Sequence, residues 1–335
     1  MAALYQLHML ERCAGLVFAF LFHGGRGARI TDENLAAHLD HPRDWIWLHL
    51  GLADHRAKRF IEGFDPLPGP ARQLLLAPRE ERIQFHLTAT GAYGVLPDIE
   101  RDFADHSLGT GRLAFWFDAG HLVTSRLHSL RGVEHVRQNI ENGGELAAPV
   151  TALVRLQEEF TGLVEQRLVV LGGELGRIED EVLADRDHIG RDVLGPLRRE
   201  LSRYAREFSA LRGAIHRAMS ARYVVQGGPL LEQLPLLLQE AEDFERDAAA
   251  LSERSRLLYE EIGSRLADRS NRALSALTVI STLLLPPTFV AGAFGMNVGG
   301  IPWAQSPEGF WAALGFCLLL ILSGWALLRR FRILP

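Results

Sequence analysis

The sequence of 335 residues predicts an α+β membrane protein, in which an N-terminal α/β domain is followed by a long helical region and two C-terminal transmembrane helices. Three observations predict this class. Short apolar runs separated by Gly, Pro and Asp fill residues 1–130, as in mixed α/β domains. A helical pattern with few breaks follows. Two uncharged apolar stretches then close the sequence, each long enough to cross a bilayer.

Residues 1–130 are expected to form six strands and two short helices, because β-branched and aromatic residues cluster there between turn-forming residues. The expected strands are Gly15 to Phe22, Trp45 to Leu50, Arg82 to Leu87, Ala92 to Leu96, Arg112 to Phe117 and His121 to Arg126. The expected helices lie near Ala53 to Gly63 and Pro70 to Leu76. The stretch from Cys13 to Phe22 lacks a small-residue cleavage site, so it is interpreted as a strand and not as a secretory signal.

From about Val133 onward the pattern is helical. Pro149 suits the first turn of a helix that reaches about Ala184. A break at residues 190–195 and a turn at residues 226–229 flank a second helix, Pro196 to Tyr223. One very long helix then starts near Leu236, and its apolar seam recurs at spacings of three and four: Ala241, Phe244, Ala248, Leu251, Ser255, Leu258 and Ile262. This seam indicates packing either on the helix's own domain or on identical copies around an axis.

The first uncharged stretch, Ala273 to Phe294, has 22 residues, which span about 33 Å as a helix. Gly309 to Leu328 is the second, with 20 residues. Arginines precede the first stretch and follow the second, whereas the connection between the stretches has no Lys or Arg. Both chain ends are therefore expected in the cytoplasm. These flanking residues are Arg265, Arg269, Arg272, Arg329, Arg330 and Arg332.

The predicted organisation has seven segments. In chain order they are a cytoplasmic α/β domain (1–130), a cytoplasmic helical region (131–235), a stalk helix (236–272), a first transmembrane helix (273–294), a periplasmic loop (295–308), a second transmembrane helix (309–328) and a cytoplasmic tail (329–335).

Composition narrows the classes of function. A net charge of -5, from 36 basic and 41 acidic side chains, argues against a nucleic-acid binder. The sequence has no phosphate-binding loop, nucleophile elbow or metalloprotease helix, so an enzyme is not expected. The two cysteines, Cys13 and Cys317, are expected to be buried thiols in a reducing compartment.

Polar and small residues recur on one face of the first transmembrane helix. The stripe consists of Asn271, Leu274, Thr278, Ser281, Leu285, Thr288 and Gly292. Such a face indicates either the lining of a narrow pore or a surface on which transmembrane helices pack closely. Two helices of one chain do not enclose a water-filled path, so conduction requires several copies around an axis. Pro286 and Pro287 lie within this helix, where they are expected to remove backbone donors and free carbonyl groups around Leu283.

The outer end of the same helix carries Gly295-Met296-Asn297, preceded by Pro286-Pro287-Thr288-Phe289. In this position and order the two elements resemble the Gly-Met-Asn signature and the Pro-x-Thr-Phe element of the CorA superfamily of divalent-cation channels. The continuation Gly299-Gly300-Ile301-Pro302-Trp303 is similar to the ZntB zinc-transport branch of that superfamily. The resemblance is closest over residues 270–335 and looser in the rest of the chain.

The resemblance implies a homopentamer with a funnel-shaped cytoplasmic domain, a stalk helix that continues into a pore-lining first span, and a second span outside it. Carried over to this sequence, Asn297 forms an outer selectivity ring, and Gly295 and Met296 shape the turn that aims its amide inward. Thr288 and Leu285 line the upper pore. The cytoplasmic constriction consists of Leu274 and Asn271, and Ser281 and Thr278 lie between these levels.

The implied activity is transport of Zn²⁺, and of related cations such as Co²⁺, Ni²⁺ and Cd²⁺, across the cell inner membrane by a multi-pass protein without a cofactor. Proton coupling remains open. Zinc prefers nitrogen and sulfur ligands in tetrahedral geometry, and the pore face has no His, Cys, Asp or Glu. We therefore expect the ion to pass largely hydrated. A CorA-type Mg²⁺ and Co²⁺ channel is the first alternative. A membrane-anchored coiled-coil sensor or scaffold is the second.

Two further sets of residues bear on metal ions. Glu260 lies near the membrane end of the stalk, and we expect it to attract cations to the inner mouth. His38 with His41, or His49 with His55, forms a candidate soft-metal site, although isolated core or surface histidines are far commoner.

Overall fold

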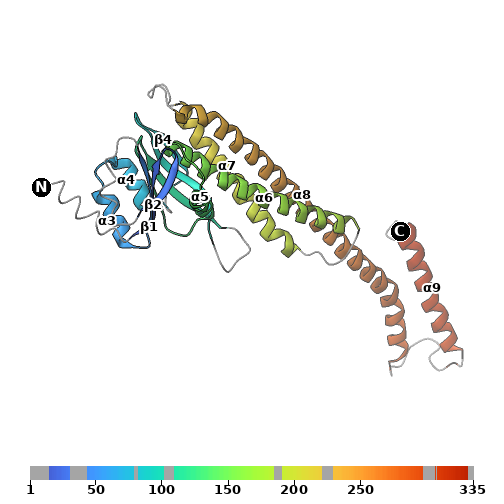
Figure 1. Cartoon of the computed structure of the whole chain (residues 1–335). Helices are drawn as coiled ribbons and strands as arrows, with labels where there is room; N and C mark the ends of the chain where they lie inside the picture. The colour runs from blue at the N-terminus through green and yellow to red at the C-terminus, as the bar shows by residue number, and fades with distance from the viewer. Residues whose placement is uncertain are drawn as a thin grey trace. The chain divides into compact units, whose positions relative to one another are not determined.

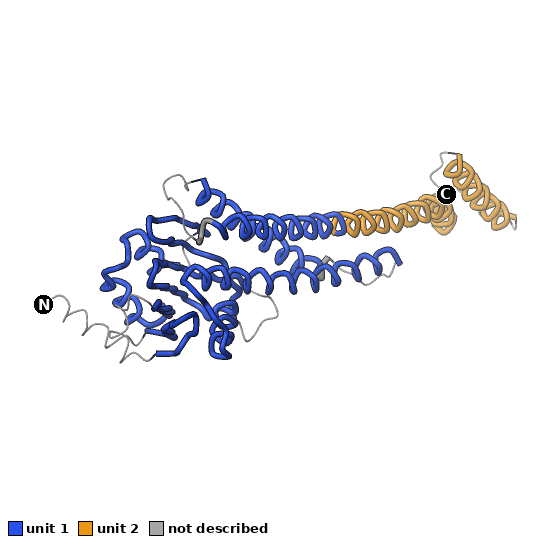
Figure 2. Tube along the Cα trace, turned by 45° about the horizontal axis from the view of Figure 1, so that its top comes forward, with its two compact units in different colours: residues 1–258 blue, residues 259–335 orange. Residues whose placement is uncertain are grey.

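The structure is a computed structural model, and it describes residues 15–30, 44–78, 82–101, 109–184, 191–220, 229–296, 306 and 308–330. Two compact units divide the chain, Met1–Leu258 and Tyr259–Pro335 (Figure 2). Figure 1 labels the helices and strands. The first unit combines a sheet with helices, and the second contains the end of α8 together with α9.

Seven described strands form one mixed sheet in the first unit, in the order β2-β1-β3-β7-β6-β5-β4. Neighbouring strands are antiparallel except β3 and β7, which are parallel. Their bounds are β1 Leu16–His23, β2 Arg26–Ile30, β3 Trp45–Gly51, β4 Gln84–Leu87, β5 Ala92–Ile99, β6 Thr110–Phe117 and β7 His121–Arg126. The six expected strands are confirmed within a few residues at each end.

Strand β2 is the one that sequence reasoning missed. Its residues Arg26–Ile30 are exposed or half-buried at the sheet edge, so they lack the apolar alternation that marks a strand. Gly24 and Gly25, at φ 56° and 88°, form the two-residue turn that joins β1 to β2. A two-residue hairpin of this kind requires positive φ at both positions, which glycine tolerates. The Gly-Gly pair was therefore the signal for the missed hairpin.

Both faces of strand β3 are buried, because helices cover the sheet on each side (Figure 1). Ile46, Leu48 and Leu50 belong to the cluster beneath α3 (His55–Gly63) and α4 (Gly69–Leu76). The alternate residues Trp45, Trp47 and His49 face the other side, where the Trp45 Nε1–H donates to the Leu146 carbonyl at 3.3 Å. The Trp-Ile-Trp-Leu-His-Leu run is therefore a central strand of this domain.

His49 is a satisfied core histidine. Its Nε2 accepts from Arg126 Nε at 2.9 Å, so its proton lies on Nδ1, which lies 2.8 Å from Thr124 Oγ1. Burial and then the charge of Arg126 lower the pKa of His49 well below its ordinary value, which keeps the ring neutral. A metal site at His49 and His55 is therefore wrong, because both His49 nitrogens are engaged. His38 and His41 lie outside the described residues.

The helices after the sheet are α5 (Arg131–Glu141), α6 (Pro149–Leu183), α7 (Arg191–Ser220) and α8 (Pro229–Phe294). Helix α6 has the predicted bounds, with Ala184 as its C-cap. Helix α7 begins at Arg191, so the expected break over residues 190–195 is too long and Pro196 lies inside the helix. Helix α8 starts at Pro229, several residues before the expected Leu236.

The apolar seam of α8 packs inside its own unit. Ala241, Ala248 and Ser255 are buried, and Phe244 stacks on Phe208 of α7 with ring centroids 5.3 Å apart. The Phe208 ring in turn packs on the Phe160 ring of α6, with ring centroids 5.5 Å apart. Of the two interpretations of this seam, packing on the same domain is therefore confirmed over residues 241–258. These buried positions are not available to other copies.

Gln157 is a weak point of this helical layer. Its side chain is 3% exposed, and neither Nε2 nor Oε1 has a hydrogen-bond partner. A buried polar group without a partner costs about 1–3 kcal/mol. We expect Gln157→Met, which keeps the length of the side chain, to raise the thermal midpoint of the detergent-purified chain by about 2–4 °C per kcal/mol regained. An unchanged or lower midpoint would show that Gln157 finds a partner.

Candidate functional site

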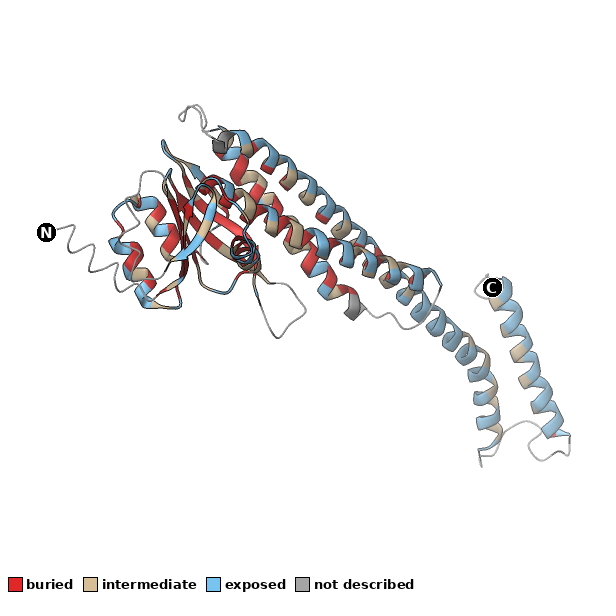
Figure 3. Cartoon of the chain, in the orientation of Figure 1, coloured by how far each residue is buried: buried red, intermediate tan, exposed pale blue. Residues whose placement is uncertain are grey.

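Among the helices that the structure describes, α8 and α9 are long and apolar enough to cross a membrane. In their most apolar windows 0% and 6% of the residues are buried. Figure 3 accordingly colours α9 (Gly309–Arg330) and the C-terminal part of α8 almost wholly as exposed. Leu285 and Phe289 expose 69% and 75% of their surface. Core helices of soluble proteins bury such residues, so these surfaces require lipid or protein neighbours.

One face of the first span packs on α9 within the second unit. On α8 the half-buried residues include Val279, Leu283 and Pro287, at helical spacing. Cys317 of α9 places its thiol sulfur 3.7 Å from the Pro287 carbonyl oxygen. A Cβ added to Gly324 would lie 3.3 Å from Leu283 Cδ2, so the absence of a side chain lets the helices approach. These contacts pair the two helices in antiparallel directions.

The polar stripe lies on the opposite face of the same helix. At about 100° per residue, its centre is roughly 180° around α8 from Leu283, which faces α9. All seven stripe residues, Asn271 to Gly292, are exposed. Packing on the second span of the same chain therefore does not explain the stripe. The remaining explanations are a water-filled path, lipid, or another copy of the chain.

Two hydroxyl groups of the stripe have fixed roles. Thr278 Oγ1 donates to the Leu274 carbonyl at 2.9 Å, and Thr288 Oγ1 donates to the Leu284 carbonyl at 2.7 Å. Because each proton is used inside the helix, each oxygen presents its lone pairs outward as an acceptor. Acceptors of this kind bind the hydrogens of water molecules that coordinate a cation.

The two prolines lie within the helix, as the sequence predicted. Helix α8 continues through Pro286 and Pro287 to Phe294. Each proline still lacks an N–H, so the carbonyls of Thr282 and Leu283, four residues earlier, have no donor from these positions. In a membrane such groups are tolerated where protein or water satisfies them. Leu283 lies on the face that meets α9, so its freed carbonyl lies at a helix–helix contact and not on the stripe.

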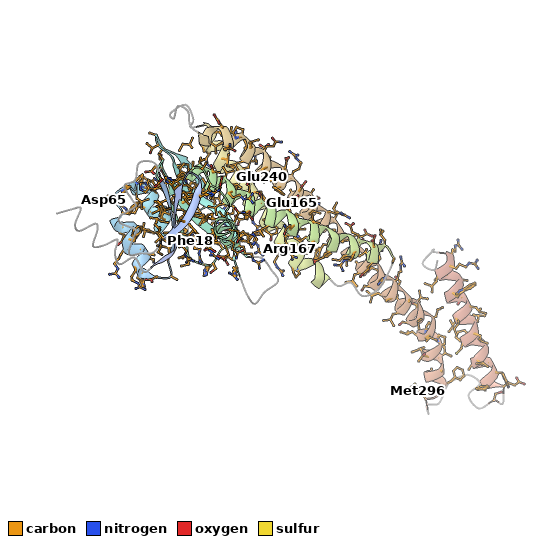
Figure 4. The ribbon with its side chains drawn as sticks, viewed as in Figure 1. Phe18, Asp65, Glu165, Arg167, Glu240 and Met296 are labelled. Atoms are coloured by element: carbon orange, nitrogen blue, oxygen red, sulfur yellow. The ribbon has the colours of Figure 1, made fainter. Side chains whose placement is uncertain are left out.

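Helix α8 closes at the first residues of the Gly-Met-Asn element. The Gly295 N–H donates to the carbonyl of Ala291 at 3.0 Å, and Met296, labelled in Figure 4, is 59% exposed. A Cβ at Gly295 would meet only backbone oxygens at 3.4 and 3.5 Å, which is ordinary contact. The described part of the chain itself therefore does not require glycine at 295. Asn297 lies outside the described residues.

Acidic residues along α8 differ in how far they are exposed. Glu260 is exposed, about 16 Å along the helix before Asn271. Glu240 is held by Thr161, whose Oγ1 donates to it at 2.7 Å, and burial raises the pKa of Glu240. No group of three or more His, Cys, Asp or Glu side chains in the described ranges is placed to hold a metal ion. The expected role of Glu260 at the inner mouth stays a prediction.

The packing face of the second span was missed by sequence reasoning. Ala313, Cys317 and Gly324 are spaced four and seven residues apart along α9. Small residues at such spacing mark a helix–helix contact in membranes, so this signal was present. Cys317 is half-buried at this contact, whereas the sequence predicted a buried thiol, and Cys13 lies outside the described residues.

Comparison with known proteins adds a family. The family described as CorA-like Mg²⁺ transporter protein matches residues 42–330. The divalent cation transporter CmaX of Pseudomonas aeruginosa is 27% identical over 327 residues, which cover 95% of this chain and 96% of the relative. The zinc transport protein ZntB of Photorhabdus laumondii is 26% identical over 320 residues, which cover 93% and 94% of the two chains.

Solved structures share the fold. The full-length CmaX protein superposes with a TM-score of 0.77 at 24% identity, covering 95% of this chain and 98% of that one. The CorA magnesium transporter of Methanocaldococcus jannaschii gives a TM-score of 0.73 at 17% identity, covering 94% and 98%. With the family matched over most of its length, the chain belongs to the CorA-like Mg²⁺ transporter family, and its class of activity is divalent-cation transport and not catalysis.

Proposed function

We propose that the chain assembles as a homopentamer in a bacterial inner membrane, with both termini in the cytoplasm, and conducts Zn²⁺ along its axis. The observation that carries the proposal is the polar stripe of α8, which is exposed and points away from the second span of its own chain. A shared aqueous axis among identical copies gives the stripe water and gives α9 a position outside it. Positions 292 and 295, where glycine has no steric reason within the described chain, are consistent with crowding at such an axis.

The ion passes largely hydrated in this proposal. Thr288 and Thr278 present acceptor oxygens, which bind the hydrogens of coordinated water and do not displace it. The Asn297 amides form the outer ring, and Asn271 forms the inner one. A ring that reads hydrated ions discriminates weakly among divalent cations. Zinc is therefore proposed from the Gly-Gly-Ile-Pro-Trp element and the ZntB relatives, and Mg²⁺ remains the competing ion.

Flux measurements test the proposal. The purified full chain in proteoliposomes is expected to admit Zn²⁺ faster than Mg²⁺. Repeating the assay with an imposed proton gradient tests coupling, whose protonated group would lie outside the uncharged spans. Faster Mg²⁺ entry would favour the magnesium channel alternative, whereas no metal-dependent flux of either ion would favour the membrane-anchored scaffold.

A pair of serine substitutions tests which face lines the path. Ser281 lies near the centre of the stripe, whereas Ser275 lies roughly a quarter turn around the helix from that centre. We expect Ser281→Leu to lower cation flux roughly tenfold or more, because several copies of a bulky apolar side chain would narrow and dry the path. Ser275→Leu is the matched control and should leave flux within about twofold. Equal effects of the two changes would contradict the assigned face.

A further inference from the structure

A polar cavity of about 340 Å³ lies in the first unit, where the end of β5 and the start of β6 meet the β7–α5 connection and helix α7. Its volume is at the lower end of the range of small-molecule sites. None of the residues assigned to transport lines it. Its lining includes Glu100, Thr110, Arg112, Leu130 and Arg203, with the exposed His128 at the rim.

Arg112 is held in position by a buried carboxylate. Its Nη1 lies 3.0 Å from Glu207 Oε2, and its Nη2 donates to Glu207 Oε1 at 3.0 Å. Glu207 is 8% exposed and also accepts from Thr110 Oγ1 at 3.2 Å. This bidentate contact fixes the plane of the Arg112 guanidinium before any ligand binds, which lowers the entropic cost of binding.

The cavity wall carries both signs of charge. Arg203 stands one turn before Glu207 on α7 and brings a second guanidinium, whereas Glu100 brings a carboxylate from the end of β5. Glycines keep this carboxylate accessible: a Cβ on Gly109 would lie 3.1 Å from Glu100 Oε2. A Cβ on Gly111 would lie 2.6 Å from Leu130 Cδ2, so a side chain does not fit there. The wall therefore combines fixed donors with an uncovered acceptor.

We propose that this cavity binds a small organic anion that carries a phosphate or carboxylate group together with hydroxyl groups. Guanidinium groups match the geometry of both anions and bind them through charge-assisted hydrogen bonds. The Glu100 carboxylate accepts only, so it binds the hydroxyl hydrogens of the same molecule. It also repels an anion that brings no donor, so a simple inorganic anion binds more weakly. This site is independent of the proposed ion path.

Calorimetry on the full chain in detergent tests the site, with glycerol 3-phosphate as the probe. Saturable binding is expected for glycerol 3-phosphate, weaker binding for inorganic sulfate, which carries no proton at neutral pH, and none for uncharged glycerol. Arg203→Met should weaken glycerol 3-phosphate binding roughly tenfold or more, because it removes hydrogen bonds between opposite charges. Glu100→Gln should weaken glycerol 3-phosphate but tighten sulfate, an opposite response that a general loss of structure would not produce.

Arg206→Met provides the matched control, because Arg206 is exposed on the same helix and does not line the cavity. Its binding should equal that of the unchanged protein. The proposal is overturned if glycerol 3-phosphate does not bind the unchanged protein. It is equally overturned if Arg206→Met weakens binding as much as Arg203→Met, since general charge attraction would then account for the binding.

Discussion

Replacing Asn297 by Leu is expected to abolish divalent-cation uptake into proteoliposomes while the assembly stays intact. In the proposed pentamer this change removes every amide of the outer ring and surrounds the path with branched apolar side chains. A hydrated ion then loses its hydrogen-bond partners at the entrance, and apolar constrictions of this kind close by losing their water. A fall of at least about a hundredfold is expected, which corresponds to a barrier increase of only roughly 2.7 kcal/mol.

Leu319→Met on α9 is the control for the Asn297 experiment. Leu319 is 60% exposed and is not assigned to the ion path, and methionine keeps its apolar character and similar volume. Flux through Leu319→Met is expected to stay within about twofold of the unchanged protein. Size-exclusion chromatography of both variants checks that the oligomer persists. Undiminished flux through an intact Asn297→Leu assembly would refute the role of Asn297 as the outer ring.

Glu200→Ala is expected to lower the free energy of unfolding by about 2–4 kcal/mol, because it leaves Arg167 without its partner. This is the largest change in stability that we predict for the chain. Glu200 is 5% exposed and accepts from Arg167 Nε at 2.7 Å and Nη2 at 2.8 Å. The Tyr204 hydroxyl donates to it at 3.1 Å. The hydrogen bond to Glu200 raises the pKa of Arg167, and burial followed by the charge of Glu200 raises the pKa of Tyr204. The expected range is below that of a fully buried pair, because the Arg167 side chain is 22% exposed.

Chemical denaturation followed by circular dichroism measures this loss, and an exposed ion pair on α6, the helix that carries Arg167, provides the comparison. Glu158 accepts from Arg155 Nη1 at 3.0 Å, and its side chain is 47% exposed. Glu158→Ala should change the free energy of unfolding by less than about 1 kcal/mol, because water screens exposed pairs. If Glu200→Ala costs no more than Glu158→Ala, the Arg167–Glu200–Tyr204 contact does not stabilise the helical layer as we infer.

The periodicity of the sequence predicted most elements, because burial imposes a repeat that the residues record. The long α6 helix was recognisable in this way, whereas β3, which is buried on both faces, was recognisable as a continuous run of aromatic and aliphatic residues. The β2 edge strand was not, since its residues face solvent and carry no repeat. The start of α7 was placed too late for a different reason: glycine and proline near a helix start suggest a break, but packing of the helix overrides that local preference.

For the site, the two uncharged spans, the spacing of the stripe from Asn271 to Gly292 and the Gly-Met-Asn element were readable from the sequence, because length, charge and helical repeat are properties of local residues. The face of α8 that meets α9, and the burial of the seam from Ala241 to Leu258 within its own unit, were visible only in the folded chain. Helical spacing shows which residues share a face, but the partner of that face depends on contacts between segments far apart in the chain.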